Sequence, residues 1–333
     1  DRIYNRFFET SYALLTIQTH LKDLYGQIGS VWDDARHKWV ADLSGVAETI
    51  RTALATDAVA GKELLSDFAR TFRVSNSTNT LEYLNFRESF VASDPDLGWV
   101  FDSGGVPVTS PPSGSNRSEA INNTQGQYSG LSGGDGNDVI YGSSSSNYIQ
   151  NNAGDAILVG GSGNDYIYAG PGADILDGGE GNDTLIGDAG NDTYTFRRGS
   201  GCDLISDYDN TANNRDTVYM GSSLGPDDII VRRTVDDLTL AITGTADRLT
   251  ISNWFSDEKY QVERVLFADA TEWDVETIKQ MALQGTEGDD ILTGYDANDN
   301  ISGLGGNDRI SGGKGDDTLD GRSESTRLNS SHT

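Results

Sequence analysis

Cysteine is almost absent from this chain of 333 residues, and because Cys202 stands alone no intramolecular disulfide can form. Proline is scarce at 6 residues, and Lys and Arg together number 24 against 52 Asp and Glu. The formal net charge of -28 disfavours binding to nucleic acid or to anionic membrane surfaces. No apolar run approaches the roughly 18 residues of a membrane-spanning helix, so no transmembrane segment is expected.

Signatures of catalysis are also missing. No His-Glu-x-x-His sequence occurs, which excludes a metalloprotease core of that type. Residues 130–134 fit Gly-x-Ser-x-Gly, but a polar linker precedes them and a glycine turn follows, so no nucleophile elbow is expected. Asp207 and Asp209 begin like an EF-hand loop, but no glycine follows at the sixth position. We therefore expect no enzyme activity in this chain.

The two ends of the chain carry their own expectations. The sequence starts at Asp1 without Met or a signal-peptide pattern, which predicts a fragment of a longer protein. Residues 322–333 resemble the translation of a sequencing-adapter oligonucleotide and are predicted to be an artefact. The preceding repeat block would then be truncated.

The first part of the chain, residues 1–102, is predicted to be a helical domain of about four helices. Apolar side chains recur at spacings of three, four and seven from Ile3 to Ile28, which defines one helical face. Further apolar-periodic stretches cover residues 42–56, 58–73 and 80–92, with Asp57 and Asn79 as expected N-caps. Asp33, Asp34 and His37 would share one helix face, which we interpret as a solvated face rather than a metal site. The Ser-, Gly- and Pro-rich residues 103–130 are predicted to be a flexible linker.

A nine-residue repeat dominates the rest of the sequence. Seven units run in phase from Gly133, and four more run in phase from Gly285. Their sixth position is aspartate in nine of eleven units, and their eighth position is Ile or Leu in ten of eleven. A disordered acidic tract has no need of an apolar residue at every ninth position, so the pattern predicts an ordered coil.

This pattern resembles the RTX, or haemolysin-type, calcium-binding nonapeptide Gly-Gly-x-Gly-x-Asp-x-U-x, where U is a large apolar residue. The resemblance implies an all-β parallel β-roll in which each unit is a turn followed by a short strand. Two units make one coil, so each unit stacks on the next but one. Calcium would lie between stacked turns, held by aspartates and by turn carbonyls. Calcium takes six to eight oxygen ligands, and glycine lets a turn aim its carbonyls at an ion.

The stacking rule predicts which residues share a calcium ion. Four sites are expected, from the pairs Asp165 with Asp183, Asp174 with Asp192, Asp290 with Asp308, and Asp299 with Asp317. Asp203 lies in a further unit displaced by two residues and could complete a site with Asp183. Asp138 faces Ala156, which has no carboxylate, so a weaker calcium site is expected there. Because Asn147 and Ala156 replace the sixth-position aspartate, residues 142–159 are expected to bind little calcium. The turn glycines included in the predicted sites are Gly161, Gly163, Gly170, Gly172, Gly179, Gly181, Gly288 and Gly306.

The repeats form two blocks, predicted at residues 131–205 and 285–321. The intervening residues 206–284 resemble the β domain interleaved between RTX blocks in large exported proteins. We expect strands on both sides of a turn at Asp236 within residues 228–243, and at residues 249–255 and 262–267. Trp254 and Trp273 are expected to pack in a core or at its end.

The resemblance implies a calcium-binding part of a large secreted bacterial protein. Such proteins leave the cell by type I secretion through a C-terminal signal that this chain lacks, and fold when they meet external calcium. The alternative is an accessory part of an RTX enzyme, cytolysin or adhesin whose active module lies upstream of Asp1. A cell-surface or host partner fits either alternative. Residues 1–102 could themselves bind a partner or a membrane, although their aromatic residues are more simply explained as a helical core.

Overall fold

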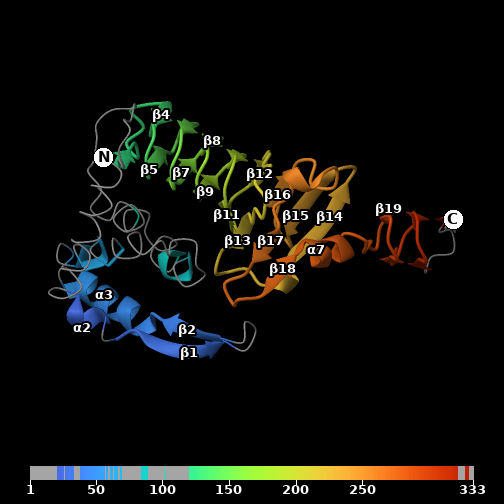
Figure 1. Ribbon diagram of the computed structural model, residues 1–333, viewed down its shortest axis with the longest axis horizontal. Coiled ribbons are helices and arrows are strands. Elements are labelled where there is room, and N and C mark those ends of the chain that lie inside the picture. The colour runs from blue at the N-terminus through green and yellow to red at the C-terminus, as the bar shows by residue number, and fades with distance from the viewer. Residues whose placement is uncertain are drawn as a thin grey trace.

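A computed structural model describes residues 21–25, 27–33, 38–56, 58, 61–62, 64–66, 68–69, 84–88, 102, 120–321 and 327–329. Most of these residues belong to an elongated parallel β-roll, with a partly helical N-terminal part lying beside it (Figure 1). Within the described residues, no helix is long and apolar enough to cross a membrane.

Two eight-stranded sheets form the roll. The first sheet is ordered β18-β17-β13-β11-β9-β7-β5-β3. Its strands are β3 Ala120–Asn122, β5 Val139–Ser143, β7 Ile157–Ser162, β9 Ile175–Glu180, β11 Thr193–Phe196, β13 Thr217–Met220, β17 Arg264–Leu266 and β18 Glu272–Asp274. The second sheet is ordered β14-β15-β16-β12-β10-β8-β6-β4. Its strands are β4 Gly130–Ser132, β6 Tyr148–Gln150, β8 Tyr166–Tyr168, β10 Thr184–Ile186, β12 Cys202–Ile205, β14 Ile229–Thr234, β15 Asp237–Ile242 and β16 Arg248–Ile251.

The chain alternates between the two sheets, one nonapeptide at a time. Tyr166 of β8 pairs with Tyr148 of β6 and with Thr184 of β10, and all three strands are parallel. Each strand therefore hydrogen-bonds to the strand of the next unit but one, which confirms the predicted two-unit coil. The roll begins earlier than predicted, because β3 lies within the expected linker and pairs with β5.

One side chain per unit fills the space between the sheets. The eighth-position residues Ile140, Ile149, Leu158, Ile167 and Leu176 are all fully buried, and they belong to one core cluster. Neighbouring side chains of a strand point to the opposite face, so the seventh position faces outward. In the second sheet that outward row is exposed, with Tyr148 and Tyr166 stacked at a centroid distance of 5.2 Å.

Residues 206–284 extend both sheets of the roll. β16 continues the second sheet in parallel to β12, and β17 continues the first in parallel to β13. The predicted strands on both sides of Asp236 form the antiparallel pair β14 and β15. Both tryptophans pack as predicted: Trp254 donates to the Val262 carbonyl at 3.0 Å, and Trp273 packs edge-on against Phe267. The 3-10 helices Pro226–Asp228 and Glu258–Tyr260 and the helix α7 (Val275–Met281) complete this segment.

The second repeat block forms two smaller parallel sheets. They are ordered β19-β21-β23 and β20-β22. Their strands are β19 Ile291–Thr293, β20 Asn300–Ser302, β21 Arg309–Ser311, β22 Thr318–Asp320 and β23 Arg327–Asn329. Leu283, just after α7, packs with Ile301 and Ile310 in a separate core. β23 falls within the predicted adapter-derived tail and pairs in parallel with β21.

The N-terminal part contains helices α2 (Lys22–Tyr25) and α3 (Ser44–Thr56), and also an antiparallel hairpin. The hairpin strands are β1 (Gly29–Asp33) and β2 (Lys38–Asp42), so an entirely helical domain is wrong over this stretch. Asp33 lies in β1 rather than on a helix, whereas Asp34, His37, Asp57 and Asn79 lie outside the described residues. Val31 and Trp32 of β1 and Trp39 and Val40 of β2 are β-branched or aromatic residues, which favour strands.

The N-terminal part packs on the outer face of the first sheet. Phe68, Phe86 and Leu65 share a buried cluster with outward-facing side chains of the roll, including Val139 and Ile175. The first sheet is therefore buried on both faces near its N-terminal end, whereas the second sheet exposes its outer face. This difference follows from the sequence, since the outward seventh position is Val or Ile in β5, β7 and β9 of the first sheet, but Tyr or Thr in β6, β8 and β10 of the second.

Candidate metal sites in the turns

The sixth-position aspartates line up in two columns, each at the point where a turn enters a strand. We call the column that precedes strands of the first sheet the first ladder; it contains Asp174, Asp192 and Asp216. The second ladder lies at the beginning of strands of the second sheet and contains Asp165, Asp183 and Asp203. All six side chains are buried, because the turns of successive coils stack on one another.

Neighbouring rungs of a ladder are joined by the same hydrogen bond. The Oδ1 atom of each aspartate accepts from the backbone amide of the sixth-position residue one coil earlier. Asp165 N donates to Asp183 at 2.7 Å and Asp174 N donates to Asp192 at 2.8 Å, both across 18 residues. Asp183 N donates to Asp203 at 3.0 Å across 20 residues, which matches the displaced unit predicted there.

The second carboxylate oxygen of each rung behaves differently. Oδ2 of Asp165, Asp174, Asp183 and Asp192 is buried and has no hydrogen-bond partner. No salt bridge joins any of these four side chains to a basic group in the described part of the chain. A buried, unpartnered carboxylate oxygen is costly, and a column of them also repels itself. The arrangement therefore suits a cation between the turns.

Glycine at the first position leaves room for this oxygen. A Cβ on Gly178 would overlap Oδ2 of Asp183 in its own unit. At the fourth position, Gly181 has a φ of 152° and lies against the Gly163 carbonyl of the preceding coil. Both positions exclude a side chain, because the turns are packed backbone to backbone around the carboxylates.

Burial and mutual repulsion alter the acidity of the ladders. Burial raises the pKa of Asp165 to about 7 and that of Asp183 to about 6, although backbone hydrogen bonds oppose the shift. Burial also raises the pKa of Asp203 to about 8. Burial, reinforced by the charge of Asp174, raises the pKa of Asp192 to about 9. The charge of a cation between the rungs would offset both causes and favour the ionised form of these groups.

Residues 142–159 are the exceptions foreseen from the sequence. Asn147 carries a neutral amide in place of a carboxylate, and its Oδ1 accepts from Ser143 N of its own turn at 2.8 Å. Ala156 contributes only its amide, which donates to Asp174 at 2.6 Å. Asp138 is buried beside this alanine coil, as expected from the stacking rule.

The second block repeats the ladder on a smaller scale. Asp290 N donates to Asp308 and Asp299 N donates to Asp317, each at 3.1 Å. Oδ2 atoms of Asp308 and Asp317 are buried without a partner, and so is Oδ1 of Asp299. Both pairs predicted from the sequence are therefore brought together here. The other predicted glycines border the same stacked turns, and all of them except Gly172 and Gly288 have positive φ: Gly161, Gly163, Gly170, Gly179 and Gly306.

Two acidic residues near the end of the first ladder were not predicted as ligands. Asp207 and Asp216 lie after the last recognisable unit, with Asp216 continuing the first ladder across 24 residues. The signal that could have revealed Asp216 is short: Asp216-Thr217-Val218 keeps the aspartate and the apolar residue of a repeat at their usual spacing. Asp207 carries no repeat signal, because a longer turn places it.

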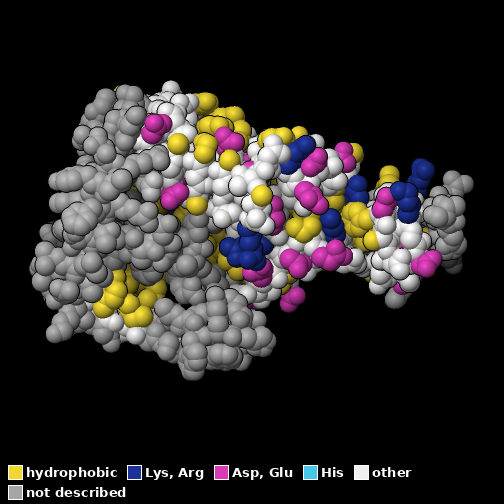
Figure 2. Space-filling view, in the orientation of Figure 1, with side chains coloured by type: hydrophobic (Ala, Val, Ile, Leu, Met, Phe, Trp, Pro, Cys, Tyr) yellow, Lys and Arg dark blue, Asp and Glu magenta, His cyan; other side chains and the backbone are white. Residues whose placement is uncertain are grey.

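Most of the ladder charge is hidden inside the turns. Figure 2 shows acidic side chains scattered over the visible face rather than gathered in one patch, with Lys and Arg interspersed among them. The surface in view therefore presents no single acidic platform, and the turns are the place where carboxylates concentrate.

Comparisons with known families agree with this geometry. The RTX calcium-binding nonapeptide repeat matches in 4 copies, at residues 131–158, 150–185, 159–194 and 284–319. The haemolysin-type calcium binding protein related domain matches residues 237–277. Residues 195–236, which include Asp207 and Asp216, lie between these matches.

A curated relative supports the same relationship over part of the chain. The iron-regulated protein FrpA of Neisseria meningitidis serogroup C is 30% identical over 106 residues. The similarity spans 31% of this chain and only 10% of the relative, so it concerns a small portion of a much longer protein.

Proposed function

On the premise that this chain is a calcium-binding protein of the RTX-repeat type, we propose that its two aspartate ladders bind calcium between successive coils and that this binding orders the roll. At least four ions would be held, by the pairs Asp165 with Asp183, Asp174 with Asp192, Asp290 with Asp308, and Asp299 with Asp317. Asp203 would complete a further site with Asp183. Turn carbonyls, including those of Gly163 and Gly172, would supply the remaining oxygen ligands.

The observation that carries this proposal is the row of buried Oδ2 atoms without partners. The coils that contain Asp165, Asp174, Asp183 and Asp192 contribute these oxygens but bury only one eighth-position side chain per unit, so such a coil gains little on folding without an ion. An ion that binds the folded turns and not the unfolded chain shifts the equilibrium toward the folded roll. Folding and calcium binding would then be one process.

RTX repeats are typical of secreted bacterial proteins, and the roll is a structural calcium-binding arrangement rather than a catalytic one. We place this chain outside the cell, exported unfolded by a type I pathway and folded by external calcium. Any enzyme, cytolysin or adhesin activity of a longer parent would lie in other segments. The repeats would then serve as an accessory part that folds on arrival outside the cell.

The direct test of calcium-driven folding uses circular dichroism of the full chain in chelator and in saturating calcium. We expect calcium to increase the β signal of the roll cooperatively above the signal seen in chelator. An identical spectrum under both conditions would contradict the proposal.

The residue assignment is tested by counting bound ions in the double variant Asp174→Ala with Asp183→Ala. This variant removes one rung from each ladder, so we expect it to bind at least two fewer calcium ions than the wild type. A matched control removes two exposed acidic side chains outside the turns, Asp227→Ala with Glu258→Ala. If both double variants bind the wild-type number of ions, the ladder residues are not the ligands.

A further inference from the structure

The end of the first ladder carries a cluster that the repeat pattern does not include. We propose that Asp192, Asp207 and Asp216 form a separate calcium site that closes the first repeat block. Asp192 belongs to the last full repeat, whereas Asp207 and Asp216 come from residues 206–216, the long turn between β12 and β13. This site depends on calcium binding by the protein but not on calcium-driven folding.

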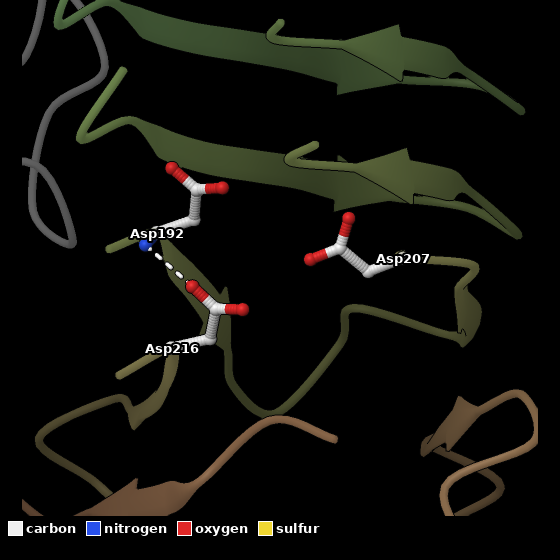
Figure 3. Close-up of side chains that lie close together, drawn as sticks. All are labelled: Asp192, Asp207 and Asp216. Carbon is white, nitrogen blue, oxygen red and sulfur yellow. Dashed lines mark hydrogen bonds between the residues drawn. The ribbon is translucent and has the colours of Figure 1, made fainter. Parts of the chain in front are cut away.

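Geometry brings the three carboxylates to one point. Oxygen atoms of Asp192, Asp207 and Asp216 all lie within 4.8 Å of one another, and all three residues are buried. Figure 3 shows them around a shared space, with Asp207 on the opposite side from the two ladder residues. Like charges this close are unfavourable unless protons or a cation intervene.

An unpartnered atom faces this cluster. Asp192 is fully buried, and its Oδ2 has no hydrogen-bond partner, whereas its Oδ1 accepts from Asp174 N at 2.8 Å. The other two carboxylates are held in place by neutral donors. Asp207 Oδ2 accepts from the Tyr194 hydroxyl at 2.7 Å, and Asp216 Oδ2 accepts from the Asn214 amide at 2.8 Å. These donors fix the oxygens without neutralising their charge.

The long turn uses carboxylates where a repeat turn uses peptide carbonyls. In the repeats, the fourth-position amide donates to a carbonyl one coil later, as Gly172 N does to Ala189 O at 2.9 Å. In the last unit the corresponding Gly190 N donates instead to Asp209 Oδ2 at 3.0 Å. Asp188 N likewise donates to Asp207 Oδ1 at 2.8 Å. The turn thus brings a third carboxylate to a position where a repeat site has two.

The chemistry of the donor set indicates the class of ion. Carboxylate oxygens without His or Cys suit a hard divalent cation. Ligands on opposite sides of calcium lie about 4.6–5.2 Å apart. The three carboxylate oxygens, all within 4.8 Å of one another, therefore fall within the span of a single calcium ion.

The test counts calcium bound to the full chain and to three isosteric variants. Asp207→Asn and Asp216→Asn each remove one charge of the cluster and keep an oxygen acceptor. Asp209→Asn is the matched control, because Asp209 lies in the same turn and caps a turn amide but is not part of the cluster. We expect the first two variants each to bind one calcium ion fewer than the wild type, and the control to bind the wild-type number.

Other results would overturn the proposal. It fails if Asp207→Asn and Asp216→Asn both retain the wild-type number of ions, or if Asp209→Asn loses an ion to the same extent. It also fails if both cluster variants lose the repeat ions together with the folded roll, since the site would then not be separate. Fluorescence of the buried Trp254 reports whether the roll remains folded in each variant.

Discussion

The ladder aspartates use their two oxygens differently. Oδ1 accepts the amide of the preceding coil, as Asp183 does from Asp165, whereas Oδ2 of the four repeat aspartates Asp165, Asp174, Asp183 and Asp192 is buried without a partner. Asparagine at this position keeps an acceptor but loses the charge, and the side chain of Asn147 bends back to its own turn. The carboxylate is therefore required for the turn-facing oxygen rather than for the stacking bond.

Substitution of the first-position glycine should destabilise the roll, as substitution of the sixth-position aspartate should. We expect Gly178→Ala to lower the free energy of unfolding in saturating calcium by about 1–3 kcal/mol, because its Cβ overlaps the Asp183 carboxylate. Chemical denaturation measures this change. Gly130→Ala is the control, since a Cβ there has open space, and equal midpoints for the two variants would contradict the explanation.

The strands of the roll are short, and each depends on its one inward side chain. Leu185 of β10 lies between Ile167 of β8 and Ile205 of β12 in the core. Sheets in isolation would not hold three-residue strands such as these. Stacking on both neighbours supplies the buried area that one unit lacks.

Truncating the inward side chain of Leu185 should strongly destabilise the roll. We expect Leu185→Ala to lower the free energy of unfolding of the calcium-bound protein by about 2–5 kcal/mol, because the cavity lies between two fixed sheets. The neighbouring outward residue provides the control, and Thr184→Ala should cost far less. Thermal or denaturant melts in calcium distinguish the two, and a similar loss for both would contradict a core role for the eighth position.

Two parts of the molecule are joined by a buried ionic contact. Asp177, at an outward position of β9, pairs with Arg197 at 2.8 Å and lies 4.0 Å from Arg87 of the N-terminal part. Arg87 also pairs with the buried Asp102. The charged groups are thus shared between the N-terminal part and the roll, inside a largely apolar contact.

Removing the shared charge should loosen this contact. We expect Asp177→Asn to destabilise the calcium-bound protein by about 2–3 kcal/mol, because Arg197 then keeps a largely buried charge without its partner. Asp228→Asn, in the exposed pair with Arg198, should change stability by less than about 1 kcal/mol. Denaturant unfolding measures the loss of stability in both variants. Equal losses for Asp177→Asn and Asp228→Asn would contradict a role of burial in the first contact.

Charge over the whole roll makes stability depend on pH and calcium together. The pKa values of Asp165, Asp183 and Asp203 are raised to between about 6 and about 8 in the folded state, so that state binds more protons than the unfolded chain. Without calcium, the free energy of unfolding should therefore fall as pH rises from about 4 through these values.

Melting temperatures test this expectation. Calcium-stripped protein should melt at a lower temperature at pH 8 than at pH 5, because its ladder carboxylates must ionise without a counter-charge. Saturating calcium should raise the melting temperature more at pH 8 than at pH 5, since ions and protons compete for the same oxygens. A calcium-free melting temperature that increases across this range would contradict the assigned buried carboxylates.

Periodicity predicted most of the roll, because aspartate and an apolar residue recur at fixed spacing within each unit. The same local reasoning failed where spacing changed or was absent. β3 carries only Ile121 as an inward residue, and its strand is stabilised by pairing with β5, which the sequence pattern does not reveal. The hairpin of β1 and β2 falls between the helix-periodic stretch that ends at Ile28 and the one that begins at residue 42, so helical spacing carried no information about it. Asp207 is placed by a turn of irregular length, so no period could identify it.

The stacking bond gives the ladders a polarity. The oxygen always belongs to the later coil and the amide to the earlier one, so the last rung has an amide left to satisfy. In the first ladder that amide is Asp216 N, and it donates to Glu263 Oε2 at 2.6 Å. Glu263 lies just before β17, and its longer side chain reaches a rung that the shorter aspartate serves elsewhere. Glu263 of the segment between the repeat blocks therefore caps the first ladder at its C-terminal end. The ladder ends at a residue that satisfies its last amide.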